Sequence, residues 1–134
     1  MENPQTTDSI ELPRTIAIAI GLYGLDIAIG IISEIFRLPE IPSNIRVFML
    51  IMTVVLNVLF AYLVLQILNG KNWARVLSLI LFLIGIPRSY TLIRREFPTV
   101  SLTTWVIIIE IVLEGLALIL IFTSSGNEWF KSKK

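Results

Sequence analysis

The sequence predicts an all-α membrane protein in which four transmembrane helices form an antiparallel bundle. Its 134 residues are 55% hydrophobic and only 16% charged, and their mean hydropathy is +0.83. A water-soluble domain has roughly 45–50% apolar and about 25% charged residues. The apolar residues form four long continuous runs, whereas a membrane barrel would show short alternating segments. Four crossings use most of the chain, so we expect a single membrane domain over residues 1–134.

The first two runs have clear boundaries. The first spans residues 13–36 and begins at Pro13, which suits the first turn of a helix because its missing N–H costs no hydrogen bond there. A proline-rich turn leads to the second run, residues 47–68. The pair Asn69-Gly70 ends that run, because glycine often terminates helices. The short connection that follows makes the second and third helices antiparallel neighbours.

The third run spans residues 73–93 and contains Pro87, which we expect to kink or end the helix because it removes a backbone donor. The fourth run spans residues 102–122. Polar tails occupy residues 1–12 and 123–134. The sequence thus predicts four helices flanked by two polar tails.

Three tryptophans support these boundaries. Trp73, Trp105 and Trp129 all fall at a predicted helix end or just beyond it. An amphipathic indole ring is suited to the headgroup region of a bilayer. We therefore expect all three to anchor the protein at the membrane interface.

The composition excludes several kinds of site. The sequence has no cysteine and no histidine, which removes thiol chemistry, imidazole catalysis, Cys/His zinc sites and axial haem histidines. We therefore expect no catalytic residues, no metal and no cofactor. The net charge is +1 and the basic residues are scattered, so nucleic acid is not an expected partner. The expected surroundings are the lipid bilayer.

Four polar side chains lie at one predicted depth, near the middle of the membrane: Asp26, Asn57, Glu110 and Glu114. An ionisable group there costs about 2.5 kcal/mol or more, so it normally faces the interior of the bundle. Glu110 and Glu114 are four residues apart and share one helix face. These residues form the candidate site.

Arg88, just after Pro87, is the single basic residue that we expect within reach of this layer. One arginine cannot neutralise three carboxylates, so at least one of them must hold a proton or share a cation. Two interpretations stay open: a site for protons or a cation, or carboxyls that join the helices by hydrogen bonds. Gly21 and Gly24 in the first helix indicate close contact with another helix.

Two short motifs suggest a family. Gly70-Lys71-Asn72-Trp73-Ala74-Arg75 and Glu128-Trp129-Phe130-Lys131 resemble a basic turn and a tail of small uncharacterised four-helix bacterial inner-membrane proteins. The resemblance implies a bacterial inner membrane and cytoplasmic termini, but no activity. Six basic residues on the terminal side against five on the other agree with this orientation.

Length and helix number are also similar to small multidrug transporters, which use a glutamate in their first helix. This chain departs from them because it has Asp26 there and its acidic pair, Glu110 and Glu114, in the fourth helix. We expect a non-enzymatic accessory, regulatory or immunity-type subunit that contacts another membrane protein or a second copy. The alternative is a small proton- or cation-coupled transporter that uses these three acids.

Overall fold

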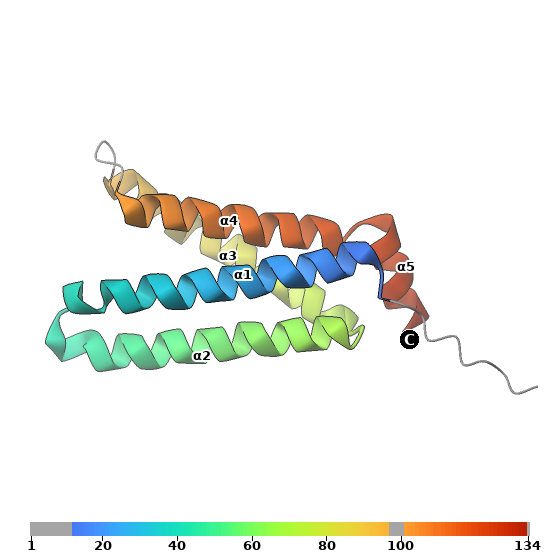
Figure 1. Ribbon diagram of the computed structural model, residues 1–134, viewed down its shortest axis with the longest axis horizontal. Helices are drawn as coiled ribbons and strands as arrows, with labels where there is room; N and C mark the ends of the chain where they lie inside the picture. Colours follow the sequence, from blue (N-terminus) through green and yellow to red (C-terminus); the bar gives the residue numbers. More distant parts are fainter. Residues whose placement is uncertain (1–11, 97–100, 134) are drawn as a thin grey trace, which may run out of the picture.

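The computed structural model describes residues 12–96 and 101–133 and confirms an all-α membrane bundle. Its four long helices lie side by side (Figure 1) and have these bounds: α1 (Arg14–Arg37), α2 (Ser43–Leu68), α3 (Asn72–Glu96) and α4 (Leu102–Ile121). All four are long and apolar enough to cross a membrane. A 3-10 turn, η1 (Leu38–Glu40), joins α1 to α2, and a short helix, α5 (Ser124–Ser132), follows α4. The chain is therefore a multi-pass membrane protein.

The helices form a ring in chain order. α1 contacts α2 and α4, and α3 contacts the same two helices from the other side (Figure 1). The bundle has two different ends. We call the end with the start of α1, the α2–α3 turn and α5 the terminal end, and the end with η1 and the start of α4 the loop end.

Two helices are longer than the sequence indicated. α2 begins at Ser43, directly after Pro42, and α3 continues through Pro87 to Glu96. Pro87 therefore does not end the helix, in agreement with the predicted span of residues 73–93. A helix that stopped in the hydrocarbon region would leave further backbone groups without partners, so one lost hydrogen bond is the smaller cost. The predicted N-terminal tail, except Leu12, lies outside the described residues.

The structure confirms the prediction that the second helix ends at Asn69-Gly70. Gly70 has a positive φ of 72° and donates its N–H to the Ile67 carbonyl, while Lys71 donates to Gln66. This pair of bonds is the Schellman arrangement that closes a helix. A methyl group on Gly70 would lie only 2.6 Å from Cβ of Lys133. Glycine therefore allows both the turn and the close approach of the C-terminal segment.

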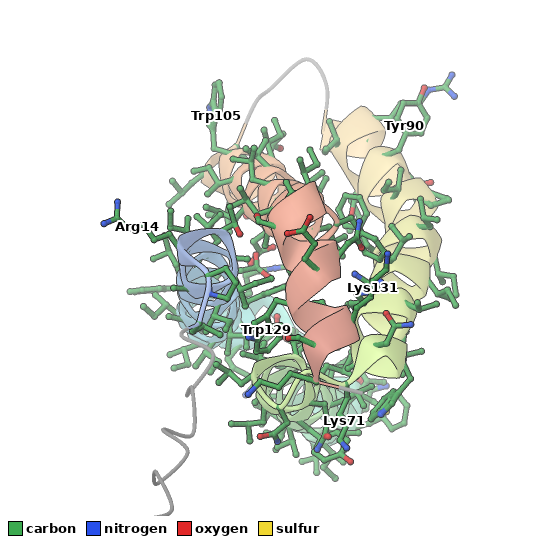
Figure 2. All side chains as sticks on the ribbon, turned by 90° about the vertical axis from the view of Figure 1, so that its right-hand side faces the viewer. Arg14, Lys71, Tyr90, Trp105, Trp129 and Lys131 are labelled. Carbon is green, nitrogen blue, oxygen red and sulfur yellow. The ribbon has the colours of Figure 1, made fainter. Side chains whose placement is uncertain are left out.

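The apolar core lies at the terminal end. Its buried residues come from all four long helices and from α5: Ile16, Ala19, Tyr23, Leu63, Ile67, Ala74, Ala117, Leu118, Ile121, Trp129 and Phe130. α5 lies across this end of the bundle (Figure 2) and buries its two aromatic residues against the core. The predicted polar tail thus contains a packed helix that the sequence did not indicate.

Arg75 holds α5 in place. Its Nη1 donates to Oδ1 of Asn127 over 2.6 Å, and its guanidinium lies 4.9 Å from the ring centre of Phe122 and 4.7 Å from that of Phe130. Aromatic faces attract guanidinium groups. The Thr15 and Ser125 hydroxyls, 3.0 Å apart, also join α1 to α5. The two motifs behind the family resemblance therefore meet at the terminal end.

The three tryptophans differ in how exposed their side chains are. Trp73 is exposed at the start of α3, and Trp105 is 57% exposed in the first turn of α4 and points away from the bundle (Figure 2). Trp129 is only 4% exposed and packs edge-on against Phe130, with 4.9 Å between the ring centres. The prediction that Trp129 faces the headgroups is wrong, because α5 folds back onto the core.

Candidate functional site

A cavity of about 360 Å³ lies between the four long helices, from the middle of the bundle toward the loop end. All five polar residues of the predicted site line it: Asp26 from α1, Asn57 from α2, Arg88 from α3, and Glu110 and Glu114 from α4. The position of each residue along its predicted helix was therefore sufficient to predict that these side chains line one space. We call this space the central cavity.

Gly30 of α1 faces Glu110 of α4 beside the central cavity. A methyl group on Gly30 would lie 3.4 Å from Oε1 of Glu110, so the carboxylate lies directly against the α1 backbone. Glu114 follows one turn later on the same face of α4, toward the terminal end. The two glutamates therefore face the cavity at successive depths.

Two carboxyl oxygens in the cavity have no partner. Oδ1 of Asp26 and Oε1 of Glu114 are buried, and neither forms a hydrogen bond within the described residues. The hydrogen bond that Asn57 forms among the described residues stays within its own helix, because its Nδ2 donates to the Thr53 carbonyl over 2.9 Å. Carboxyls that joined the helices would have partners across the bundle. The structural interpretation therefore does not account for these two oxygens.

Arg37 is a cavity residue that the sequence analysis missed. It lines the central cavity together with Arg88 and Glu110. The expectation of a single basic group within reach is therefore wrong. The predicted first helix stopped at residue 36, which placed Arg37 in a turn. Its spacing could have revealed it, because Arg37 follows Gly30 by seven residues and therefore shares its helix face.

Glu34 has a local role. Its Oε1 accepts a hydrogen bond of 3.3 Å from the Thr53 hydroxyl and so joins α1 to α2. It does not line the central cavity. Among the described residues, no group of three acids is placed to hold a metal ion together. The cavity carboxyls are therefore spread around the space instead of converging on one point.

Gly21 and Gly24 do not form the close helix contact that we expected within the chain. No atom lies within 4 Å of a methyl group built on either residue. Both are exposed on α1, as are Ala17 and Ala28 on the same side of the helix. We call these four residues the small-residue face of α1. Among residues 12–96 and 101–133, no side chain packs closely against its two glycines.

The family pattern described as a domain of unknown function, DUF4345, matches residues 12–121. The chain belongs to the DUF4345 family. The matched range begins just before α1 and ends at the last residue of α4, so it contains the central cavity but not α5. Comparison with curated proteins and with solved structures finds no match. The DUF4345 description names no activity, so function must be argued from the cavity.

The cavity of this DUF4345 protein is suited to binding a positive charge. Three acids and two arginines line it, so the acids are in excess when all five are ionised. A buried carboxylate without a partner is unfavourable unless it gains a proton or a cation. Apolar side chains, such as Leu56 and Phe60, form other parts of the wall. A small cation with an organic surface would match both kinds of wall.

Proposed function

We propose that this chain is a non-enzymatic accessory or regulatory membrane subunit that binds a small organic cation in its central cavity. The observation that carries the proposal is the pair of buried, unpartnered oxygens, Oδ1 of Asp26 and Oε1 of Glu114, in two residues that line the central cavity. An ammonium group has three donors and would satisfy such oxygens. A bare metal ion fits less well, because the described acids do not converge as metal ligands.

Regulation fits the shape of the cavity better than transport. Three buried core residues lie about one helical turn beyond the cavity and close its terminal side: Tyr23, Leu63 and Ala117. A bound cation could then leave only by the way it entered. Its binding would change the loop half of the bundle, which a partner protein could sense.

A proton- or cation-coupled transporter is the second candidate. The same unpartnered acids favour it, because transporters use buried ionisable groups to carry charge across the membrane. It requires the packed terminal end to open, at least transiently. Flux measurements therefore separate the two candidates.

The small-residue face of α1 supports an accessory role. Small side chains let membrane helices approach closely, and nothing in the described part of the chain covers Gly21 or Gly24. The partner would be a helix of another membrane protein, as an immunity-type subunit requires, or α1 of a second copy. We also propose a bacterial inner membrane with both termini in the cytoplasm, where Lys131 and Lys133 of the terminal end would meet anionic headgroups.

The test is methylammonium binding to the protein in phosphatidylcholine nanodiscs, measured by calorimetry. Glu114→Gln should weaken binding about tenfold, because it removes one charged acceptor, and Asp26→Asn should act similarly. Glu128→Gln is the matched control, since Glu128 is exposed on α5 and does not line the cavity. The absence of binding, or equal binding by all variants, would contradict the proposal.

The same probe tests transport. Radiolabelled methylammonium should not enter liposomes that contain the protein any faster than it enters empty ones. Entry that depends on Glu114 would favour the transporter instead.

A further inference from the structure

A second hollow lies outside the bundle, between the last turns of α1 and the first turns of α4. It has a volume of about 520 Å³, and its walls are mainly apolar: Ile29, Ile32 and Phe36 from α1, and Leu102, Val106 and Ile107 from α4. Ligand sites typically have volumes of about 300–1,000 Å³. We call this hollow the lateral groove. It is exposed to the hydrocarbon of the bilayer, because Ile32, Phe36 and Leu102 are all exposed.

The lateral groove adjoins the central cavity. Three residues line both spaces: Arg37, Ile107 and Glu110. Arg37 is the last residue of α1, at the loop end, where the exposed ring of Trp105 indicates the headgroup region. Glu110 lies deeper, two turns along α4. A guanidinium and a carboxylate therefore stand along the boundary between an apolar groove and a polar cavity.

We infer that the lateral groove binds one phospholipid with an amine headgroup, of the phosphatidylethanolamine type. One acyl chain would lie along the apolar walls, the phosphate would meet Arg37, and the ammonium would enter the cavity toward Glu110. Guanidinium binds phosphate well, and a carboxylate accepts hydrogen bonds from an ammonium. The inference rests on the proposed cation-binding function, because the headgroup supplies the cation.

The positions of the two charged residues, Arg37 near the headgroup region and Glu110 deeper in the bundle, select this class of lipid. An acidic headgroup, such as phosphatidylglycerol, would satisfy Arg37 but would leave Glu110 without a cation. A choline headgroup has the positive charge but no N–H to donate to a carboxylate. An ethanolamine headgroup has both the charge and the donors. The site therefore distinguishes lipids by both the phosphate and the terminal group of the headgroup.

The test compares phosphatidylethanolamine, phosphatidylcholine and phosphatidylglycerol with identical chains, bound to the detergent-solubilised protein and detected by native mass spectrometry. Phosphatidylethanolamine should bind about tenfold more tightly than the other two. Glu110→Gln should remove this preference, and Arg37→Gln should weaken the binding of all three lipids. Arg14→Gln is the control for Arg37, because Arg14 is exposed at the terminal end (Figure 2).

A variant that changes no charge tests the groove itself. Val106→Trp should fill the groove and displace the lipid, while Val112→Trp, on an exposed face of the same helix, should have no effect. Lipid binding without a headgroup preference, or a Val106→Trp protein that binds lipid normally, would overturn the inference. Methylammonium binding, measured in parallel, separates the two proposals: if it persists while the lipid preference is absent, only the inference about the groove fails.

Discussion

The two ends of the bundle differ in packing: the terminal end holds an apolar core, and a polar cavity extends from the middle toward the loop end. At the terminal end, Arg75 is enclosed by two aromatic rings and bonded to Asn127, beside a closely packed apolar core. From the middle of the bundle toward the loop end, acids and arginines surround open space instead. Buried polar atoms without a partner occur in both regions: Oδ1 of Asp26 and Oε1 of Glu114 in residues that line the cavity, and the Tyr23 hydroxyl, Nε of Arg75 and Nε1 of Trp129 at the terminal end. We therefore expect the core at the terminal end to provide stability and the central cavity to provide the proposed site.

The largest effect should come from the terminal core. Leu63 and Leu65 are two residues apart on α2, but Leu63 is 1% exposed and Leu65 is 56% exposed. Leu63→Ala should lower the free energy of unfolding by about 2–5 kcal/mol, because it leaves a cavity in the core. Leu65→Ala should have a much smaller effect. Steric-trapping measurements in bicelles would test this, and equal losses would show that the terminal end is not the stabilising core.

The next largest loss of stability should come from disrupting the contact between Arg75 and α5. Arg75→Lys keeps the charge but loses the planar group between Phe122 and Phe130, which should cost about 1–2 kcal/mol. α5 should then exchange its amide hydrogens faster. Arg95→Lys, at an exposed position on the same helix, is the control. Unchanged exchange in α5 would mean that Arg75 does not hold it.

A smaller effect on stability, but a specific effect on binding, should follow from substitution of Gly30. Valine there would press on the Glu110 carboxylate, because even a methyl group comes within 3.4 Å of it. Gly30→Val should therefore weaken methylammonium binding about tenfold. Gly24→Val, with open space around it, should leave binding unchanged. If both variants bind normally, Glu110 does not take part in the site.

The smallest change in stability should come from the unpartnered acids. Glu114→Gln removes a buried charge that has no partner, so the free energy of unfolding should stay the same or rise by about 1 kcal/mol. A purely structural carboxyl would behave in the opposite way, since its loss would leave another helix without a bond. Thermal unfolding followed by Trp fluorescence would distinguish the two roles.

The sequence predicted the four helices and the five cavity residues because both depend on simple counting. Long apolar runs define the spans, and Asp26, Asn57, Glu110 and Glu114 fall at one depth along them. The partners of these residues could not be predicted, because hydrogen bonds depend on helix rotation and side-chain conformation.

The missed features depend on tertiary contacts. α5 has only 9 residues and a polar first turn, so its sequence alone does not specify a stable helix. Its position results from Arg75, fifty residues earlier in the chain, and from burial of Trp129. Arg37 was missed because a one-residue error at the end of α1 moved it from the cavity to a turn.

The most direct test of the central claim is an infrared difference spectrum of the protein in nanodiscs, recorded with and without methylammonium. Carboxylates that bind the cation should shift their stretching bands. The shift should disappear in a double variant, Asp26→Asn with Glu114→Gln, whose resistance to unfolding remains at the wild-type level or above it. No shift in the wild type, or the same shift in the double variant, would contradict a cation site in the central cavity.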